Sequence, residues 1–414
     1  MLTDFDSPFN FMVGAYYQET SRDFDQWIAF GGVEDSSQTP DKRYVATAKD
    51  SETDGETFAV FGQAIWSISD TLEATVGARY IDESKDSYFQ QPFGNAALAF
   101  IFRPADDPSG LGVVTADQSF TNLSPEATLR WTPMDDFMVY AAFKSGYKSG
   151  GFSNSGINSG FSQDPSGDLT FAEEESDGFE VGLKSTLMDN QLRFNATAYM
   201  YDFTDLQIDF FRSDIFAFQT VTADASTSGI ELEMQYAPLS LAGFEMHGSI
   251  NYNKSEYEDS ILPCYNGQTP ARGCNISLPS GPHQNVDGVE TSVAPEWTGM
   301  IGGSYEFEVS SSMSMRLAAD ARYSSDYIGS GFGQPFNAQD SYWYADASAR
   351  LMSNDGAWEL ALIAKNLTDE FYISNGQDGP STGSGTGTDA GVMADQMGLG
   401  NIPRTIALEA TVWF

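Results

Sequence analysis

The chain has 414 residues, of which 39 are Gly, 14% are aromatic and only 19% are charged. Its 59 acidic and 20 basic residues give a formal net charge of −39, a field that repels polyanions, so no nucleic-acid partner is expected. Two explanations of the acidity stay open: solvated loops in a salty environment, or loops that attract cations or cationic complexes. The abundance of Gly, Tyr and Phe predicts an all-β fold.

Neither a transmembrane helix nor a signal peptide is predicted. No stretch approaches about 18 consecutive apolar residues, the length that a membrane-spanning helix needs. The opening residues MLTDFDSPFN have no basic start and no apolar core. Any membrane crossing is therefore expected from strands.

Apolar and polar residues alternate with a period of two in segment after segment. In 191–201, for example, Leu192 and Phe194 alternate with Arg193 and Asn195. A period of two puts the two sets on opposite faces of a strand. Segments of about ten such residues are what a tilted membrane-spanning strand needs.

In chain order, this pattern predicts fourteen strands. They lie near 8–19, 56–68, 71–83, 117–132, 136–148, 172–187, 191–210, 216–237, 243–257, 293–308, 312–328, 341–352, 357–367 and 402–414. Very short connections alternate with mostly long, polar ones, which are expected near 20–55, 84–116, 149–171, 258–292, 329–340 and 368–401, with one short exception near 212–214. Outer-membrane barrels have short periplasmic turns and longer extracellular loops, so a transmembrane antiparallel β-barrel is predicted.

One predicted strand fits the pattern poorly. In 56–68, Phe61 and Ile65 share the face that should be polar. The sequence does not explain this, although neighbouring protein inside the barrel could cover such residues.

The last predicted strand ends the chain on an aromatic residue. From Thr405 onward, apolar residues including Ile406 and Leu408 fall on every second position, up to Phe414. This ending resembles that of outer-membrane β-barrels, in which a terminal Phe is part of the signal for the barrel-assembly machinery. Phe414 is therefore predicted to be a terminal assembly signal.

Five sequence blocks follow one another along the chain. They are YAAFKSGYKSGGF at 140–152, FEVGLKSTLMDNQLRFNATAYMY at 179–201, SGIELEMQYAP at 228–238, KNLTDEFY at 365–372 and IPRT at 402–405. In this order, and with the terminal Phe, they resemble the carboxy-terminal barrel portion of a TonB-dependent outer-membrane receptor. The resemblance extends from about Phe11 to Phe414.

The resemblance implies energised uptake of a bulky nutrient, such as a ferric siderophore, haem, cobalamin or a glycan. In that family a 22-stranded barrel encloses an amino-terminal plug that carries the box gripped by TonB. No signal peptide, TonB box or plug is recognised in this sequence, and its roughly fourteen strands resemble the last fourteen of the family. We expect residues 1–414 to form a partial barrel domain without a plug. A misplaced start in a longer gene, or a truncated or fragmentary product, would explain this, and TonB would act only through the missing plug.

Charged residues on the polar face of the predicted strands are expected to point into the lumen. They are Glu180, Lys184, Arg193, Glu231, Glu233, Arg316, Asp320 and Arg322. Opposite charges on neighbouring strands are expected to pair. Solvation of the interior or contact with a plug is the favoured role, and a substrate path is the alternative.

Cys264 and Cys274 are the only cysteines and lie in one predicted outer loop. An even pair in an oxidising compartment favours a local disulfide over metal ligation, because no second Cys pair or His cluster is nearby. With only two His in the chain, no metal site, cofactor or catalytic triad is predicted, and no enzyme activity is expected. Calcium binding by acidic loops, such as Glu173 to Glu175, stays open as a minor alternative.

The favoured interpretation is thus the barrel part of a TonB-dependent receptor in the outer membrane of a Gram-negative bacterium. Its expected partners are outer-membrane lipid, the barrel-assembly machinery and a bulky nutrient, for example a ferric siderophore. Two alternatives stay open: a passive porin-like channel formed by a closed smaller barrel, and a surface-attached β-sandwich that binds carbohydrate or cells.

Overall fold

The computed structural model describes residues 2–29, 34–98, 101–153, 156, 158–212, 217–279, 281–331, 334–379, 382–383 and 391–414. All of the predicted long connections lie partly outside the described residues, most of all the one at 368–401, and so does most of the short one near 212–214. No helix in the described residues is long and apolar enough to cross a membrane.

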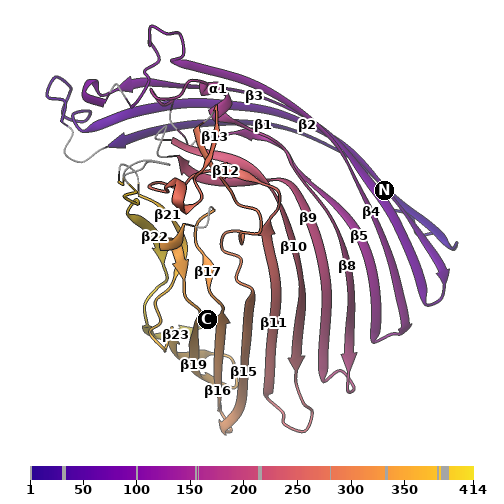
Figure 1. Cartoon of the computed structure of the whole chain (residues 1–414). Coiled ribbons are helices and arrows are strands. Elements are labelled where there is room, and N and C mark those ends of the chain that lie inside the picture. Colours follow the sequence, from indigo (N-terminus) through magenta and orange to yellow (C-terminus); the bar gives the residue numbers. More distant parts are fainter. Residues whose placement is uncertain are drawn as a thin grey trace.

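A single antiparallel sheet of fourteen strands forms most of the protein (Figure 1). In spatial order, which is also chain order, its strands are β1 (Phe9–Ala29), β2 (Val45–Ser69), β3 (Leu72–Gly94), β4 (Val113–Met134), β5 (Phe137–Lys148), β8 (Glu174–Leu187), β9 (Leu192–Arg212), β10 (Ala217–Tyr236), β11 (Phe244–Tyr257), β15 (Trp297–Ser310), β16 (Met313–Ser324), β19 (Tyr342–Ser353), β20 (Trp358–Lys365) and β23 (Thr405–Val412). The prediction of fourteen sequentially paired strands is confirmed. One continuous sheet is not a sandwich of two packed sheets, so the β-sandwich alternative is wrong.

The remaining elements lie in the long connections and gather at one end of the sheet, while the short turns lie at the other (Figure 1). They are η1 (Ala96–Leu98), β6 (Gly151–Phe152), α1 (Pro165–Leu169), β7 (Thr170–Phe171), β12 (Ile261–Pro263), η2 (Pro270–Arg272), β13 (Ile276–Leu278), β14 (Gly281–Asn285), β17 (Tyr327–Ile328), η3 (Pro335–Asn337), β18 (Ala338–Gln339), β21 (Ile373–Asp378) and β22 (Gln396–Gly400). Strands β12, β13 and β14 pair with one another in a small sheet of their own. We call this end of the molecule the loop end.

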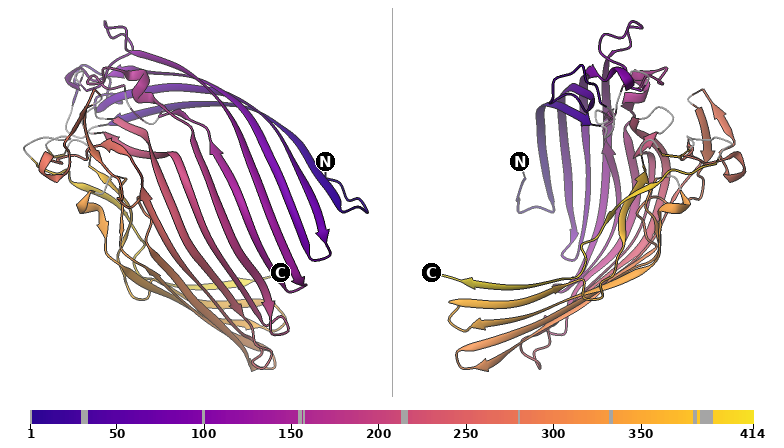
Figure 2. Two further views of the ribbon diagram at one scale, coloured as in Figure 1. Left: turned by 45° about the vertical axis from the view of Figure 1, so that its right-hand side comes forward. Right: turned by 90° about the vertical axis from the view of Figure 1, so that its left-hand side faces the viewer.

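The main sheet is curved and open (Figure 2). Within the described residues, β1 pairs only with β2 in this sheet, and β23 pairs only with β20. The far edges of β1 and β23 therefore present backbone N–H and C=O groups that have no described strand beside them, except near Phe11, which exchanges hydrogen bonds with Thr3. In hydrocarbon each unpaired group costs several kcal/mol, so in a membrane these edges must pair with each other or with further strands.

The two faces of the sheet differ in polarity because the side chains alternate. Ile250 on β11 and Ile301 on β15 point to one face and are 53% and 56% exposed, although both are aliphatic. His247 and Asn251 of β11 lie on the opposite face, which is rich in charged and amide side chains. On that polar face, side chains two strands apart touch one another, as the concave side of a curved sheet allows.

Several strand boundaries differ from the prediction at the loop end. The predicted loop at 20–55 is paired over most of its length, with Thr20 opposite Gly55 and Asp25 opposite Asp50. Likewise β3 and β4 extend into the predicted loop at 84–116. These extensions carry polar residues on both faces, so they lack the apolar alternation that marks a half-buried strand, whereas antiparallel hydrogen bonding needs no apolar face.

Phe61, the residue that disagreed with the pattern, does lie on the polar face of the sheet. It sits opposite Gly14 of β1, where an added Cβ would fall 2.2 Å from the ring. On its other side, the guanidinium of Arg79 lies 5.8 Å from the ring centroid. Glycine on one side and a cation on the other thus accommodate an aromatic ring on the polar face.

Candidate functional site

The structure places all eight of the predicted lumen-facing charged residues on the polar face, and most of them have partners on other strands. Asp320 lies 2.8 Å from His247, and Arg316 lies 3.4 Å from Glu245. The Arg322 guanidinium lies 3.7 Å from Asp346. These pairs connect β16 with β11, over the intervening strand β15, and with β19.

The remaining predicted charges lie on β8, β9 and β10. Glu180 pairs with Lys144 at 2.8 Å and accepts a hydrogen bond from Tyr201. The ammonium of Lys184 lies 5.9 Å from the ring centroid of Tyr140. Glu233 accepts a hydrogen bond of 3.3 Å from Asn195. Arg193 and Glu231 share this face by their position in the strand register.

Glycines beneath these contacts let side chains from alternate strands meet. His247 on β11 and Asp320 on β16 approach each other directly over Gly302 of the intervening strand β15. A Cβ on Gly302 would lie 2.2 Å from the Asp320 carboxylate and 2.6 Å from His247 Nε2. Three further polar pairs meet over a glycine in the same way: Gln63 and Glu126 over Gly77, Tyr140 and Thr197 over Gly182, and Tyr199 and Asn253 over Gly229.

Two of the sequence blocks, KNLTDEFY and IPRT, interlock where β20 leaves the sheet and β23 enters it. Asn366 is 4% exposed, and its side-chain amide donates to the carbonyls of Glu370 and Ile402 at 2.8 and 3.3 Å. Asp369 accepts from the backbone N–H of Arg404 at 3.1 Å and pairs with its guanidinium at 3.4 Å. These residues therefore fix the exit and return of the last long connection.

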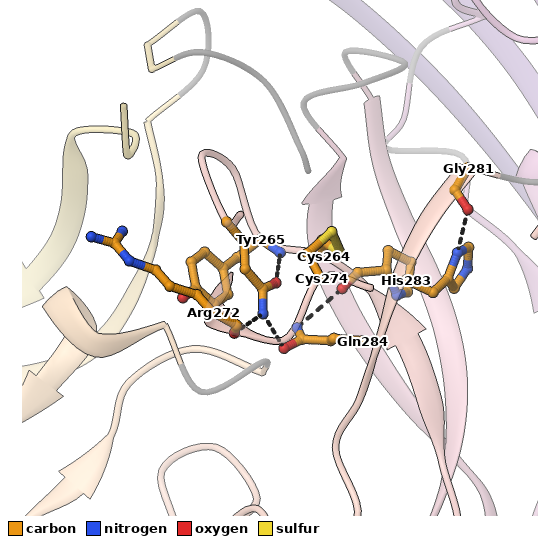
Figure 3. Close-up of a disulfide and its surroundings, with 9 residues drawn as sticks. Cys264, Tyr265, Arg272, Cys274, Gly281, His283 and Gln284 are labelled. Atoms are coloured by element: carbon orange, nitrogen blue, oxygen red, sulfur yellow. Dashed lines mark hydrogen bonds between the residues drawn. A yellow bond between two sulfur atoms is a disulfide. The ribbon is translucent and has the colours of Figure 1, made fainter. Parts of the chain in front are cut away.

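At the loop end, the sulfur atoms of Cys264 and Cys274 are joined at 2.03 Å (Figure 3). The loop between them is held from inside by Gln268, which accepts from the Tyr265 backbone N–H and donates to the Arg272 carbonyl at 3.1 and 3.0 Å. Gln268 also donates to Gln284 of β14 at 2.8 Å. The disulfide loop is thus attached to the small sheet beside it.

A hollow of about 270 Å3 opens beside the disulfide loop, and we call it the outer hollow. Five parts of the chain meet there: the loop ends of β9 and β10, the disulfide loop, residues 330–331 with 334, β21, and the connection after β6 through Ser153. Its lining residues are Ser153, Asp209, Phe210, Phe218, Gln219, Thr220, Cys264, Tyr265, Ser330, Gly331, Gln334, Asn375, Gly376, Gln377 and Asp378. A second hollow, of about 780 Å3, shares Gln219 and Thr220 with the first.

Two polar atoms in the outer hollow lack a hydrogen-bond partner among the described residues. They are Nε2 of Gln334, whose residue is only 1% exposed, and Oγ of Ser330. Burial also raises the pKa of the Tyr265 phenol, so this hydroxyl stays protonated at neutral pH. The outer hollow therefore offers neutral hydrogen-bond donors to a guest molecule.

Comparison with known proteins assigns the chain to a family. The family model described as TonB dependent receptor-like, beta-barrel matches residues 2–367. The chain belongs to this family. Similar solved structures of such receptors include the ferric yersiniabactin uptake receptor FyuA from Yersinia pestis (15% identity, TM-score 0.71), the siderophore receptor PiuA from Acinetobacter baumannii (14%, 0.66) and the closed form of the ferric-catecholate import receptor Fiu from E. coli K12 (16%, 0.64).

These structures cover 99–100% of this receptor barrel, whereas the chain covers only 53–54% of theirs. At such low identities the likeness shows the fold alone. It agrees with the all-β prediction and with the family that the five sequence blocks resemble.

A group of stacked tyrosines on the polar face of the receptor barrel was not predicted from the sequence. Tyr372, which follows β20, stacks on Tyr342 of β19 with centroids 4.1 Å apart and planes 8° from parallel. Tyr344 lies 5.7 Å from Tyr372, and the Arg322 guanidinium lies 5.6 Å from the ring centroid of Tyr344. The alternation of β19 could have placed Tyr342 and Tyr344 on one face, but not the distant Tyr372 upon them.

The predicted terminal assembly signal, Phe414, lies just beyond β23 and is fully exposed. Its neighbour Trp413 donates a backbone hydrogen bond of 3.0 Å to Ala357, in the turn before β20. Among the described residues there is no group of three or more His, Cys, Asp or Glu side chains arranged to hold a metal ion, and Glu173 to Glu175 form none.

Proposed function

We propose that this chain forms part of the wall of an outer-membrane receptor that takes up a bulky nutrient, such as a ferric siderophore, with energy supplied through TonB. The observation that carries the proposal is the family match, read together with a sheet that is apolar on one face and polar on the other. Two of the similar receptors take up ferric chelates, ferric yersiniabactin in FyuA and ferric catecholates in Fiu.

In this proposal the apolar convex face contacts lipid, and the loop end faces the outside of a Gram-negative cell. Aromatic side chains support this orientation, because Trp131 near the short turns and Tyr323 and Trp343 towards the loop end are 48%, 47% and 59% exposed on the sheet surface. Such aromatic bands mark the two interfaces of a membrane. Phe414 would serve recognition by the barrel-assembly machinery.

The polar concave face would line the lumen. Arg316 and Arg322 pair there with carboxylates, and Asp320 contacts His247, so these side chains would keep the interior wettable. Coupling to TonB runs through a plug domain in this family, so it is proposed for the complete receptor and not for the strands described here. The disulfide between Cys264 and Cys274 would stabilise an outer loop.

The test is iron uptake by the native organism under iron limitation. Deletion of the gene is expected to abolish uptake of at least one radiolabelled ferric chelate, and the restored gene is expected to recover it. Unchanged uptake of every chelate in a broad panel would contradict the proposed ligand class. A stable, unselective conductance of the purified protein in a planar bilayer would favour the passive channel instead.

A further inference from the structure

The side chains of the outer hollow share one chemical property, the absence of a cation. Among the described residues that line it there is no Lys or Arg, whereas Asp209 and Asp378 both contribute carboxylates. The adjoining hollow is lined by Asp164 and Asp168 and likewise by no Lys or Arg among the described residues. The other polar side chains are amides and hydroxyls, together with the imidazole of His283 in the adjoining hollow.

Most of the basic residues of the protein are engaged elsewhere, although Arg272 of the disulfide loop lies close enough to Tyr265, in the lining, to act on its phenol. At least twelve of the twenty Lys and Arg side chains pair with a carboxylate. Lys49, at the loop end, is 2% exposed and donates to the Gly156 carbonyl at 2.6 Å. An anionic ligand in the outer hollow would therefore meet uncompensated negative charge, within a protein whose net charge is −39.

The same hollow provides what an oxygen-rich ligand without negative charge requires. Gln334 Nε2 and Ser330 Oγ lack partners among the described residues and can donate to ligand oxygens. Donation to such a ligand would remove the cost of leaving the buried Gln334 amide unsatisfied. Asp209 and Asp378 can accept from ligand N–H groups or stabilise an ammonium, and Tyr265 offers an aromatic ring.

We propose that the outer hollow selects a ligand that carries no net negative charge, a neutral or cationic oxygen-rich chelate, and disfavours polyanionic chelates such as ferric tris-catecholates. This inference rests on the proposed function and narrows its ligand class. It separates this protein from Fiu, the similar import receptor for ferric catecholates. The selectivity is set by the carboxylates of the hollow and not by the overall acidity alone.

The test measures binding of two ferric complexes to the protein purified in detergent. One is the cationic complex of a linear tris-hydroxamate with a free ammonium group, and the other is a trianionic ferric tris-catecholate. Quenching of Trp fluorescence gives both dissociation constants. The cationic complex is expected to bind at least about tenfold more tightly at low salt, and the ratio is expected to fall as salt is raised.

Isosteric substitutions locate the effect. Asp209→Asn and Asp378→Asn each remove a negative charge from the hollow and are expected to lower the cationic-to-anionic preference roughly two- to tenfold. Asp106→Asn makes the same change at an exposed position outside the hollow and is expected to leave the ratio unchanged. Melting temperatures of all variants would identify any that fail to fold, and having two substitutions in the hollow guards against that outcome.

The outcomes separate this inference from the proposed function. Equal or tighter binding of the catecholate complex would overturn the inference and leave uptake of ferric chelates standing. A preference that Asp106→Asn lowers as much as the hollow variants would also overturn it, because the field would then be global. Binding of no chelate, in a panel that spans cationic, neutral and anionic complexes, would contradict the proposed function, and the inference would fall with it.

Discussion

An arginine placed on the apolar face of β11 should cost far more than one placed next to it on the polar face. The perturbation is Ile250→Arg, and the matched control is Ser249→Arg. On the apolar face of β11, residues from Phe244 to Tyr252 are apolar or glycine, and Lys254 is the first charge beyond them. Ile250 is 53% exposed inside this band, so an arginine there would face hydrocarbon.

The magnitude follows from the depth of this position. Arginine on the lipid face of a transmembrane barrel costs about 2–4 kcal/mol near the midplane, which is roughly a 30- to 900-fold change in the folding equilibrium. Ser249 lies opposite Glu233 of β10 on the polar face, so an arginine there gains a carboxylate neighbour. We expect Ser249→Arg to change stability by no more than about 0.5 kcal/mol.

The assay is guanidinium titration of the protein in phospholipid vesicles, followed by Trp fluorescence. The free energy of unfolding is expected to fall for Ile250→Arg and to stay nearly constant for Ser249→Arg. An equal loss of unfolding free energy in both variants would show that the two faces do not lie in different environments, lipid on one side and water on the other. A larger loss for Ser249→Arg would mean that the apolar and polar faces are assigned the wrong way round.

Three further predictions concern a close approach, a crosslink and a buried charge. Gly302→Ala should lower the free energy of unfolding by about 1–3 kcal/mol, because its Cβ would lie 2.2 Å from a carboxylate oxygen. The control Gly299→Ala, whose Cβ would have its nearest atom at 3.6 Å, should lower it far less. Equal losses in the same guanidinium titration would refute the clash. Replacing Cys264 and Cys274 by Ser removes a crosslink between residues ten apart, worth about 2.7 kcal/mol in the chain-entropy model. Hydrogen exchange should become faster in 262–286 but not in β1. The same change of exchange rate in both regions would argue against this prediction. Burial lowers the pKa of Lys49 to about 8, below its value in the unfolded chain, so between about pH 8 and 10.5 the unfolded chain binds a proton that the folded protein does not. Stability at the loop end, measured as protection from hydrogen exchange, should therefore rise as the pH rises through that window. A Lys49→Met variant that shows the same rise would contradict this assignment.

The number and order of the strands were predictable because the alternation of apolar and polar residues along a membrane-spanning strand is a local pattern. A period of two over about ten residues needs no knowledge of neighbours, and short turns such as the one between Ser69 and Leu72 fix antiparallel pairing. The extensions of β1 to β4 beyond that pattern were missed, because polar residues fall on both of their faces and no apolar alternation marks them, even where they are buried, as at Thr47 and Ser51. Thr20 and Gly55, for instance, pair although their surroundings are polar.

The contacts that organise the polar face depend on residues far apart in the chain. In the sequence, nothing distinguishes Gly302 from other strand glycines. Only the pairing of β15 with β11 on one side and β16 on the other shows that His247 and Asp320 meet above it. The same holds for Tyr372, whose stacking partner Tyr342 lies on another strand. Strand register across three strands decides these contacts, and a single sequence carries no direct signal for it.

The outer hollow was beyond prediction for a related reason. Gln334, Tyr265 and Asp378 come from three separate connections, and nothing in their local sequence places them together. The composition indicates acidic loops, but it does not indicate which carboxylates gather around one hollow. By contrast, the KNLTDEFY and IPRT blocks were recognisable as motifs, and the structure gives Asn366 and Asp369 a structural reason for their identity.

The most direct test of an energised receptor is the energy dependence of ligand uptake in cells that make this protein from its native locus. Radiolabelled ferric chelate is followed into the periplasm before and after the inner-membrane proton gradient is collapsed with a protonophore. We predict that uptake falls to the level of the gene deletion while binding at the cell surface persists. Uptake that continues unchanged without the gradient would contradict an energised receptor and would indicate a passive channel.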